Sequence, residues 1–171
     1  MSVFKKLDKN KFFLVNQKNN LICVLVIISI FFFDRISKLK IINHQTNNNV
    51  IYITDFINFD LVWNTGIGFG ILSSNSNLIY NSISSVIGII IIFLIYLIFK
   101  SKLIDKLLFS LVLGGALGNF YDRIVFSAVP DFIDIHFQRF HWFTFNIADI
   151  FITLGVMLLI IKDLFLKNDK N

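Results

Sequence analysis

Residues 114–149 hold most of the side chains that could do chemistry in this otherwise apolar chain. The stretch contains four aspartates together with amide and guanidinium groups: Asp122, Asp131, Asp134, Asp149, Asn119, Asn146 and Arg123. Carboxylates are costly to keep beside apolar membrane segments, and where they occur they usually line a wet functional cavity. The pattern predicts a membrane-embedded hydrolase in which Asp131 and Asp149 are the working groups.

An aspartate pair has a defined chemistry. One carboxylate, ionised, acts as a base on water, while the other, protonated, polarises the carbonyl group under attack. Mutual repulsion and a low-dielectric environment separate the two titrations, so that acid and base coexist in one site. This chemistry suits amide hydrolysis. Asp131 also follows Pro130, the single proline of the chain, which fixes the local backbone that presents the carboxylate.

Structural interpretations of the same residues remain open at this point. Asn146 and Asp149 are spaced like a helix N-cap and its reciprocal partner, so Asp149 could serve only to cap a helix. Asp122 and Arg123 could form an interfacial ion pair at the end of a membrane span. For this second pair we favour the structural interpretation.

Other chemistries have weaker support. Ser127 lies near the aspartates, but no Ser-Lys or Ser-His pairing is indicated strongly. His136 and His141 belong to an aromatic-rich stretch that we interpret as an interfacial loop, with Trp142 at headgroup level. A histidine metal site would need a third clustered ligand, and none is spaced convincingly. We therefore expect no metal and no cofactor.

The composition is that of a membrane protein with a single domain, residues 1–171. Hydrophobic residues make up 56% of the 171 residues and charged residues only 16%, which is too apolar for a soluble globule. The net charge of +5 does not indicate nucleic-acid binding, because the lysines cluster at the ends of apolar runs. The single cysteine, Cys23, cannot form an internal disulfide.

Four apolar stretches predict transmembrane helices at about residues 20–42, 80–99, 103–121 and 143–166. The basic N-terminus also resembles the start of a signal peptide, but no small-residue cleavage site follows, so we prefer an uncleaved first span. Asp34 and Lys38 stand one helical turn apart near its outer end and can pair as ions. Small residues in the third span, Gly114, Gly115 and Gly118, predict close packing against a neighbouring helix.

Residues 43–77 predict a small extracytoplasmic β-sheet between the first two helices. Runs of β-branched and aromatic residues at 50–54 and 57–63 precede three glycines, Gly66, Gly68 and Gly70. Asn64 ends the second run, where a turn residue is the simpler interpretation. The predicted fold class is an all-α membrane protein with four transmembrane helices and this sheet.

The distribution of positive charge predicts the topology. Eleven of the sixteen lysines and arginines fall on one side of the four-span arrangement, so both termini should be cytoplasmic. The polar ends of the first, third and fourth spans then reach the same outer level. This convergence would bring together Asp34, Lys38, Asn119, Asp122, Arg123, Asn146 and Asp149.

Five blocks of the chain resemble, in order and spacing, those of bacterial signal peptidase II: DRISK at 34–38, NTGIGFG at 64–70, GGALGNFYDR at 114–123, VPDFID at 129–134 and FNIAD at 145–149. The resemblance implies a catalytic dyad of Asp131 and Asp149. It implies supporting roles for Asp34, Lys38, Asn64, Asn119, Asp122, Arg123 and Asn146. Arg35 stands where glutamine is usual, and Ile67 and Gly68 replace the more common alanines.

The resemblance also implies the reaction: cleavage of prolipoprotein signal peptides before a diacylglyceryl-modified cysteine, without metal or cofactor, with the extracytoplasmic sheet cradling the substrate. We expect a monomer in the bacterial inner membrane, with lipid-modified prolipoproteins and membrane lipids as partners. Three rivals remain. A transporter should carry polar groups through the full membrane depth, a presenilin-type protease should carry a GxGD block, and a noncatalytic assembly factor is the third.

Overall fold

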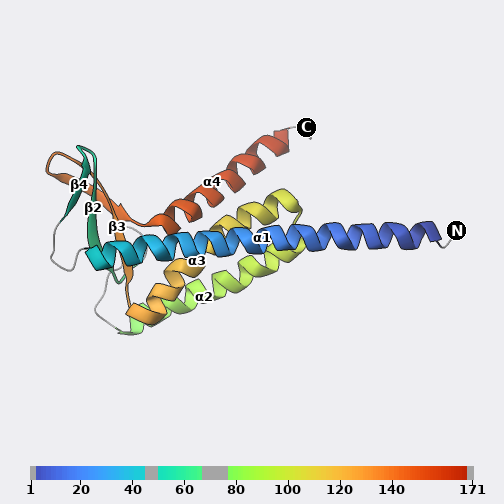
Figure 1. Cartoon of the computed structure of the whole chain (residues 1–171), viewed down its shortest axis with the longest axis horizontal. Coiled ribbons are helices and arrows are strands. Elements are labelled where there is room, and N and C mark those ends of the chain that lie inside the picture. Colours follow the sequence, from blue (N-terminus) through green and yellow to red (C-terminus); the bar gives the residue numbers. More distant parts are fainter. Residues whose placement is uncertain (1–2, 45–49, 67–76, 169–171) are drawn as a thin grey trace.

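The computed structural model describes residues 3–44, 50–66 and 77–168. In these ranges the chain forms four helices and four strands, in the order α1 (Val3–His44), β1 (Ile51–Thr54), β2 (Ile57–Asn64), α2 (Asn77–Lys100), α3 (Leu103–Phe126), β3 (Val129–Phe137), β4 (Phe140–Phe145) and α4 (Ile147–Asn168). The sheet lies at one end of the helices, and both chain termini lie toward the other end (Figure 1).

Within the described residues, three helical segments are long and apolar enough to cross a membrane: Gln17–His44, Tyr80–Lys100 and Leu103–Phe126. These match the first three predicted spans. Large apolar side chains point outward from them, including Ile92 at 70% and Phe99 at 67% exposure. Such exposure suits a lipid environment, in which apolar surface carries no penalty.

The first predicted span, about residues 20–42, lies within the apolar segment Gln17–His44, and the helix α1 that contains it begins earlier, at Val3. The polar first part of α1 contains no glycine or proline that would interrupt a helix. The predicted start of the fourth span was wrong. α4 begins at Ile147 and not at residue 143, because the preceding residues, Phe140–Phe145, form a strand. Aromatic residues favour strands where a partner strand is available.

The four strands form one antiparallel sheet in the order β1-β2-β3-β4. The predicted sheet contained only residues 43–77, and the aromatic stretch around His136 was interpreted as an interfacial loop. Instead β3 and β4 form a hairpin, and β3 pairs along β2 with Val62 opposite Asp131 and Asn64 opposite Val129. Pairing with β3 covers the edge of β2 that would otherwise be open.

The helix α3 is central, because it packs against each of the other three helices. The predicted close packing is confirmed at its glycines. A Cβ atom on Gly115 would lie 2.5 Å from the carbonyl oxygen of Ala148 in α4, and one on Gly118 would lie 2.6 Å from Oδ2 of Asp34 in α1. No side chain fits at either place without moving its neighbours.

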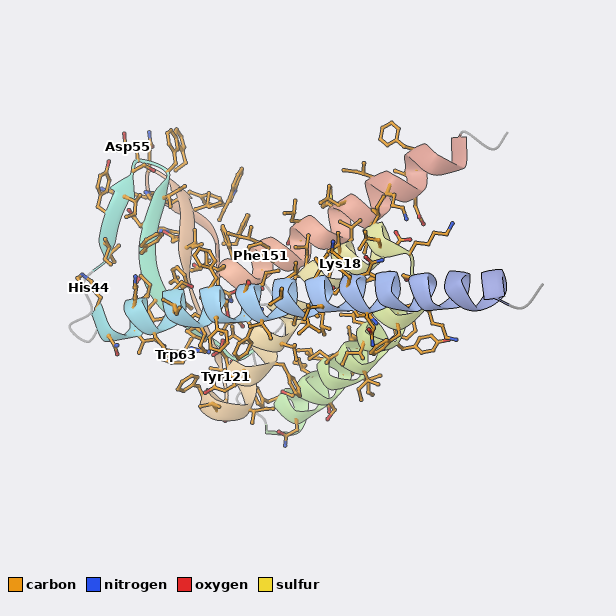
Figure 2. The ribbon with its side chains drawn as sticks, turned by 45° about the vertical axis from the view of Figure 1, so that its right-hand side comes forward. Lys18, His44, Asp55, Trp63, Tyr121 and Phe151 are labelled. Atoms are coloured by element: carbon orange, nitrogen blue, oxygen red, sulfur yellow. The ribbon has the colours of Figure 1, made fainter. Side chains whose placement is uncertain are left out.

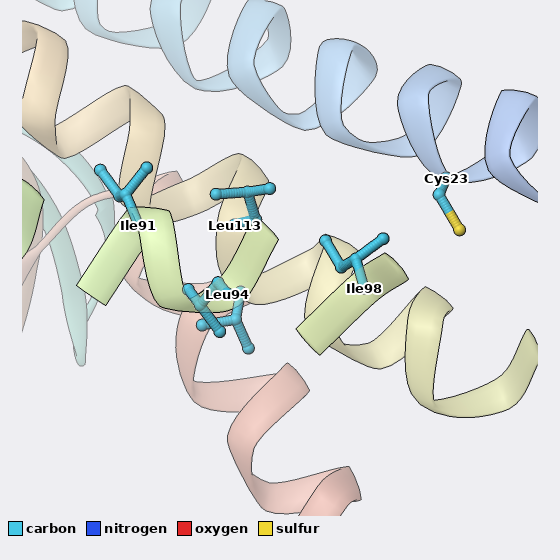
Figure 3. Packing of buried hydrophobic residues seen from close by; sticks show 6 residues of the cluster. Cys23, Ile91, Leu94, Ile98 and Leu113 are labelled. Carbon is cyan, nitrogen blue, oxygen red and sulfur yellow. The ribbon is translucent and has the colours of Figure 1, made fainter. Parts of the chain in front are cut away.

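An apolar core lies among α1, α2 and α3, formed by Cys23, Ile91, Leu94, Ile98, Val112 and Leu113 (Figure 3). Cys23 is only 1% exposed, so it is a packing residue of this core. At the other end of the helices the sheet docks on α3, where the ring of Trp63 from β2 packs edge-on against Phe126 at 5.7 Å. Figure 2 places His44 at this sheet end of α1, far from Lys18.

Candidate active site

Lys38 of α1 lies at the centre of a buried polar cluster. Its Nζ donates to Asp34 Oδ2 at 2.7 Å, to Asn119 Oδ1 at 2.8 Å and to Asp122 Oδ2 at 2.7 Å. These three bonds use every donor of the ammonium group, which is fully buried. The predicted ion pair between Asp34 and Lys38 is therefore confirmed, and the same cation ties α1 to α3.

Asp34 and Asp122, the two carboxylates beside Lys38, each accept another hydrogen bond with the second carboxylate oxygen. Asp34 Oδ1 accepts from the backbone N–H of Ala148 at 2.9 Å, one of the free donors in the first turn of α4. Asp122 Oδ1 accepts from Nη1 of Arg35. The predicted ion pair of Asp122 with Arg123 was wrong, because neighbouring side chains on a helix point about 100° apart.

Arg123 points toward the segment that follows β2. Its Nη2 donates to the carbonyl oxygen of Gly66 at 2.7 Å, and its Nη1 lies 3.4 Å from the carbonyl oxygen of Asn119. The hydroxyl of Tyr80 in α2 donates to the carbonyl oxygen of Arg123 itself at 2.7 Å. Arg123 therefore links α3 to the end of the strand that carries Asn64.

Asp131 lies on β3 with only 3% of its surface exposed. Its Oδ1 accepts from Asn146 Nδ2 at 2.6 Å and its Oδ2 accepts from Asn64 Nδ2 at 2.9 Å. Burial raises the pKa of Asp131 to about 6, and the negative charge of Asp149 acts in the same direction. The two amide donors oppose this shift because they stabilise the ionised carboxylate.

Asp149 belongs to the first turn of α4 and forms a capping box with Asn146. The backbone N–H of Asp149 donates to Asn146 Oδ1 at 3.1 Å, and that of Asn146 donates to Asp149 Oδ2 at 3.1 Å. The remaining oxygen, Oδ1, accepts from Asn119 Nδ2 at 2.8 Å. The capping interpretation is thus correct in geometry, yet Asn146 also bonds Asp131, so one residue bridges both carboxylates.

The three asparagines of the cluster share one arrangement. Each uses Oδ1 to accept from a group that can only donate: Lys38 Nζ for Asn119, the Gly66 N–H for Asn64 and the Asp149 N–H for Asn146. Each amide group is thereby oriented, and its NH₂ faces Asp149 or Asp131. Asn64 is the last residue of β2, and its bond to the Gly66 N–H is the local contact that asparagine makes where a strand ends. The bond to Asp131 gives it a second role that the turn interpretation missed.

The charges of the cluster are nearly balanced. It contains four carboxylates and three cations. Asp34, Asp122 and Asp131 are buried and Asp149 is half-buried; the cations are Arg35, Lys38 and Arg123. With every group ionised, the cluster would carry one uncompensated negative charge, which is costly away from water. A single proton on the carboxylates removes that charge, and Asp131, with its raised pKa, is a group able to hold it near neutral pH.

An apolar groove of about 450 Å³ opens beside Asp149, lined by Phe143, Phe145, Asp149, Ile150, Thr153, Leu154 and Met157. It lies between β4 and the first turns of α4. Its volume falls in the range of small-ligand pockets, and Asp149 is the ionisable group in its lining. An apolar chain lying in this groove would place adjacent polar groups next to the aspartates.

The structure brings all nine predicted site residues into one cluster: Asp34, Lys38, Asn64, Asn119, Asp122, Arg123, Asp131, Asn146 and Asp149. Ser127 instead caps α3 with φ 55°. Ile67, Gly68 and Gly70 lie outside the described residues. Arg35 was noted only as a departure, although a second cation beside Lys38 in an apolar span was a signal of a buried carboxylate partner.

Asp134 belongs to a different cluster. Its Oδ2 lies 2.7 Å from His141 Nδ1 and 3.6 Å from His136 Nδ1. The sequence argument against a histidine metal site was that no third ligand is spaced convincingly along the chain. That premise was wrong, because strand pairing brings His141 of β4 back beside Asp134 and His136 of β3.

Comparisons with known proteins agree on one family. The model of the family described as signal peptidase (SPase) II matches residues 26–165. The chain is 51% identical over 158 residues to a lipoprotein signal peptidase of Pelagibacter ubique (strain HTCC1062), covering 91% of this chain and 95% of that protein. It is 44% identical to one of Francisella tularensis subsp. novicida (strain U112), covering 68% and 75%. A solved structure of a bacterial membrane enzyme superposes with a TM-score of 0.77 and 32% identity, covering 87% and 91%.

Proposed function

The chain belongs to the signal peptidase II family, and we propose that Asp131 and Asp149 are the catalytic pair with which it cleaves signal peptides from lipoproteins. The observation that carries this proposal is the bridge formed by Asn146, which donates to both carboxylates at once. Asp131 is buried in the polar cluster, and the half-buried Asp149 lines the apolar groove.

The pair would act on the scissile peptide with a shared proton. The ionised carboxylate removes a proton from a water molecule, whose oxygen attacks the carbonyl carbon, while the protonated carboxylate donates to the carbonyl oxygen. Collapse of the tetrahedral intermediate breaks the C–N bond, and the leaving amine takes up a proton from the pair. The single excess negative charge of the cluster favours this shared proton.

The surrounding residues would position the pair. Lys38 holds Asn119, and Asn119 in turn donates to Asp149. Asn64 and Asn146 hold the two oxygens of Asp131. Such fixed contacts preserve the geometry needed for water attack. Because all these groups come from one chain, we propose a monomer as the active unit.

The substrate we propose is a prolipoprotein bearing a diacylglyceryl-modified cysteine. The groove beside Asp149 is almost wholly apolar and lies next to the exposed aromatic face of β4. It can hold a hydrocarbon chain or the apolar part of a signal peptide. The peptide group next to that apolar anchor would then lie against the aspartates, with the sheet above it.

We propose that α4 is a fourth membrane span and that the sheet is extracytoplasmic. Eleven of the sixteen basic residues then lie on the cytoplasmic side. The position of both termini at the end opposite the sheet supports this orientation (Figure 1). The site would lie at the outer membrane interface, where a translocated prolipoprotein presents its cleavage point.

The test is cleavage by purified Asp131→Asn and Asp149→Asn variants of a prolipoprotein with and without the diacylglyceryl group. Asparagine keeps the shape of the side chain but supplies neither base nor acid, so each change should abolish cleavage. Asp55→Asn, in the exposed β1–β2 turn, is the control that should retain activity. Asparagine is as good an N-cap residue as aspartate. Substantial cleavage by either dyad variant would therefore reduce that residue to a structural role.

A further inference from the structure

A second cluster of ligand-type side chains lies in the β3–β4 hairpin, apart from the aspartate pair. The Nδ1 atoms of His136 and His141 approach the same atom, Asp134 Oδ2, at 3.6 Å and 2.7 Å. The ligand atoms of all three residues lie within 4.8 Å of one another. The two imidazole rings stack with their centroids 5.4 Å apart.

Two buried atoms at this place have no hydrogen-bond partner among the described residues. His136 is only 9% exposed, and its Nδ1 forms no hydrogen bond. The same is true of Asn58 Oδ1 on β2. Asn58 stands directly opposite Asp134 in the sheet and therefore on the same face. Unpartnered buried polar atoms are costly, and an amide oxygen and an unprotonated imidazole nitrogen both accept.

The cluster has the donors and the spacing of a transition-metal site. Zn²⁺ binds imidazole nitrogen and carboxylate oxygen at about 2.0–2.2 Å, which places tetrahedral ligand atoms about 3.3 Å apart. The separations of 2.7 Å and 3.6 Å at Asp134 bracket that value. Two histidines with one carboxylate favour a borderline divalent ion over Ca²⁺ or Mg²⁺, which prefer oxygen ligands.

We propose that Asp134, His136 and His141 bind a divalent transition-metal ion of the Zn²⁺ class, with Asn58 Oδ1 as a further oxygen donor. Asp134 and Asp131 are three residues apart on β3 and point to opposite faces of the strand. The site is therefore separate from the aspartate pair and supplies no group to peptide cleavage. Its role is to clamp β4 to β3, the strand that carries Asp131.

A simple ion pair explains less of the arrangement. A protonated His141, with its side chain 58% exposed, could donate to Asp134 without any metal. That bond leaves His136 Nδ1 and Asn58 Oδ1 buried without partners. A cation at the centre of the cluster resolves both, because each of these atoms offers it a lone pair.

The test is a calorimetric titration of Zn²⁺ into the purified full-length protein, carrying a tag without histidine, in detergent at neutral pH. We expect one ion per chain and, with Co²⁺ in its place, the visible absorption of a tetrahedral nitrogen-oxygen site. His136→Gln and His141→Gln should each weaken binding at least about 100-fold, since loss of an outer-shell partner alone costs 10–100-fold. Zn²⁺ should raise the unfolding temperature of the wild type but not that of the double variant.

Two controls locate the ion. His44→Gln changes the remaining histidine, exposed at the end of α1, and should leave binding intact. Asp131→Asn should bind Zn²⁺ as the wild type does, which excludes the aspartate pair as the site. Because the His141 side chain is largely exposed, its variant keeps the test valid if His136→Gln fails to fold. Wild-type affinity in His141→Gln, or no wild-type binding tighter than about 100 µM, would overturn the proposal.

Discussion

Replacement of Asn146 by aspartate should move the whole pH dependence of cleavage upward. In the native protein Asn146 Nδ2 donates to Asp131 Oδ1 at 2.6 Å while Asn146 Oδ1 caps α4. Asn146→Asp keeps the capping oxygen, because asparagine and aspartate are equally good N-cap residues. At the other position, however, it replaces an NH₂ donor with a second carboxylate oxygen facing Asp131.

The size of the pKa shift follows from the short distance between the new carboxylate and that of Asp131. Two carboxylate charges about 4 Å apart repel by about 4 kcal/mol at an effective dielectric constant of 20. Since one pKa unit corresponds to about 1.4 kcal/mol, this repulsion equals about 3 pKa units. It adds to the burial that already raises the pKa of Asp131 to about 6. An added negative charge favours the protonated forms of both aspartates, so the sign is upward: the pair loses its first proton and reaches the singly ionised, active state only at higher pH.

The assay is kcat/KM for a lipid-modified prolipoprotein measured from pH 5 to pH 10. For Asn146→Asp we expect a large loss at pH 7, partial recovery toward pH 9, and an acidic limb moved upward by about 2 to 3 units. Asn146→Ser is the matched control, because serine also caps well but adds no charge. It should lose activity and move the acidic limb upward by much less than Asn146→Asp does, because it loses the amide that stabilises ionised Asp131 but adds no charge.

Either of two results would refute this reasoning. If Asn146→Asp keeps the wild-type pH profile, the amide does not face a catalytic carboxylate. If Asn146→Ser moves the acidic limb as far as Asn146→Asp does, the shift comes from the lost hydrogen bond and not from charge. Because macroscopic pKa values of a coupled pair belong to both members, the shift is assigned to the pair of Asp131 and Asp149.

Two further predictions concern packing and topology. Gly118→Ala should lower activity and should lower the free energy of unfolding by about 1–3 kcal/mol, because its Cβ would lie 2.6 Å from Asp34 Oδ2. Thermal unfolding in detergent measures the loss of stability. Gly88→Ala is the control and should be nearly neutral, because its Cβ would lie 3.5 Å from the nearest atom. In intact cells a membrane-impermeant thiol reagent should label Asp55→Cys but not Lys102→Cys. Both side chains are exposed, but the proposed topology places them on opposite sides of the membrane. Labelling of Lys102→Cys from outside would contradict that topology.

Features that depend on neighbouring residues could be predicted from the sequence. The i,i+4 spacing of Asp34 and Lys38 determines their pairing on one helical face, and the spacing of Asn146 and Asp149 determines the capping box. The length and hydropathy of the apolar runs likewise predict the three spans at α1, α2 and α3. Each of these features is local, because the interacting groups lie within one turn or one helix.

Features that depend on pairing between distant segments could not be predicted in this way. That Asp122 meets Lys38 and Arg35 depends on the rotation of α3 against α1, which the close contact at Gly118 sets. An alternating aromatic stretch can be a loop or a strand, and only the partner edge of β2 decides that residues 129–145 form a hairpin.

The chemistry of the site depends on both levels. The sequence by itself determined which side chains are available: a few carboxylates, amides and cations in an apolar chain that must gather them away from lipid. Only the tertiary structure decided which way each amide faces, because that orientation is set by donors from other elements, such as Lys38 for Asn119. It also brought His141 to Asp134 through strand register, a contact that no spacing along the chain reveals.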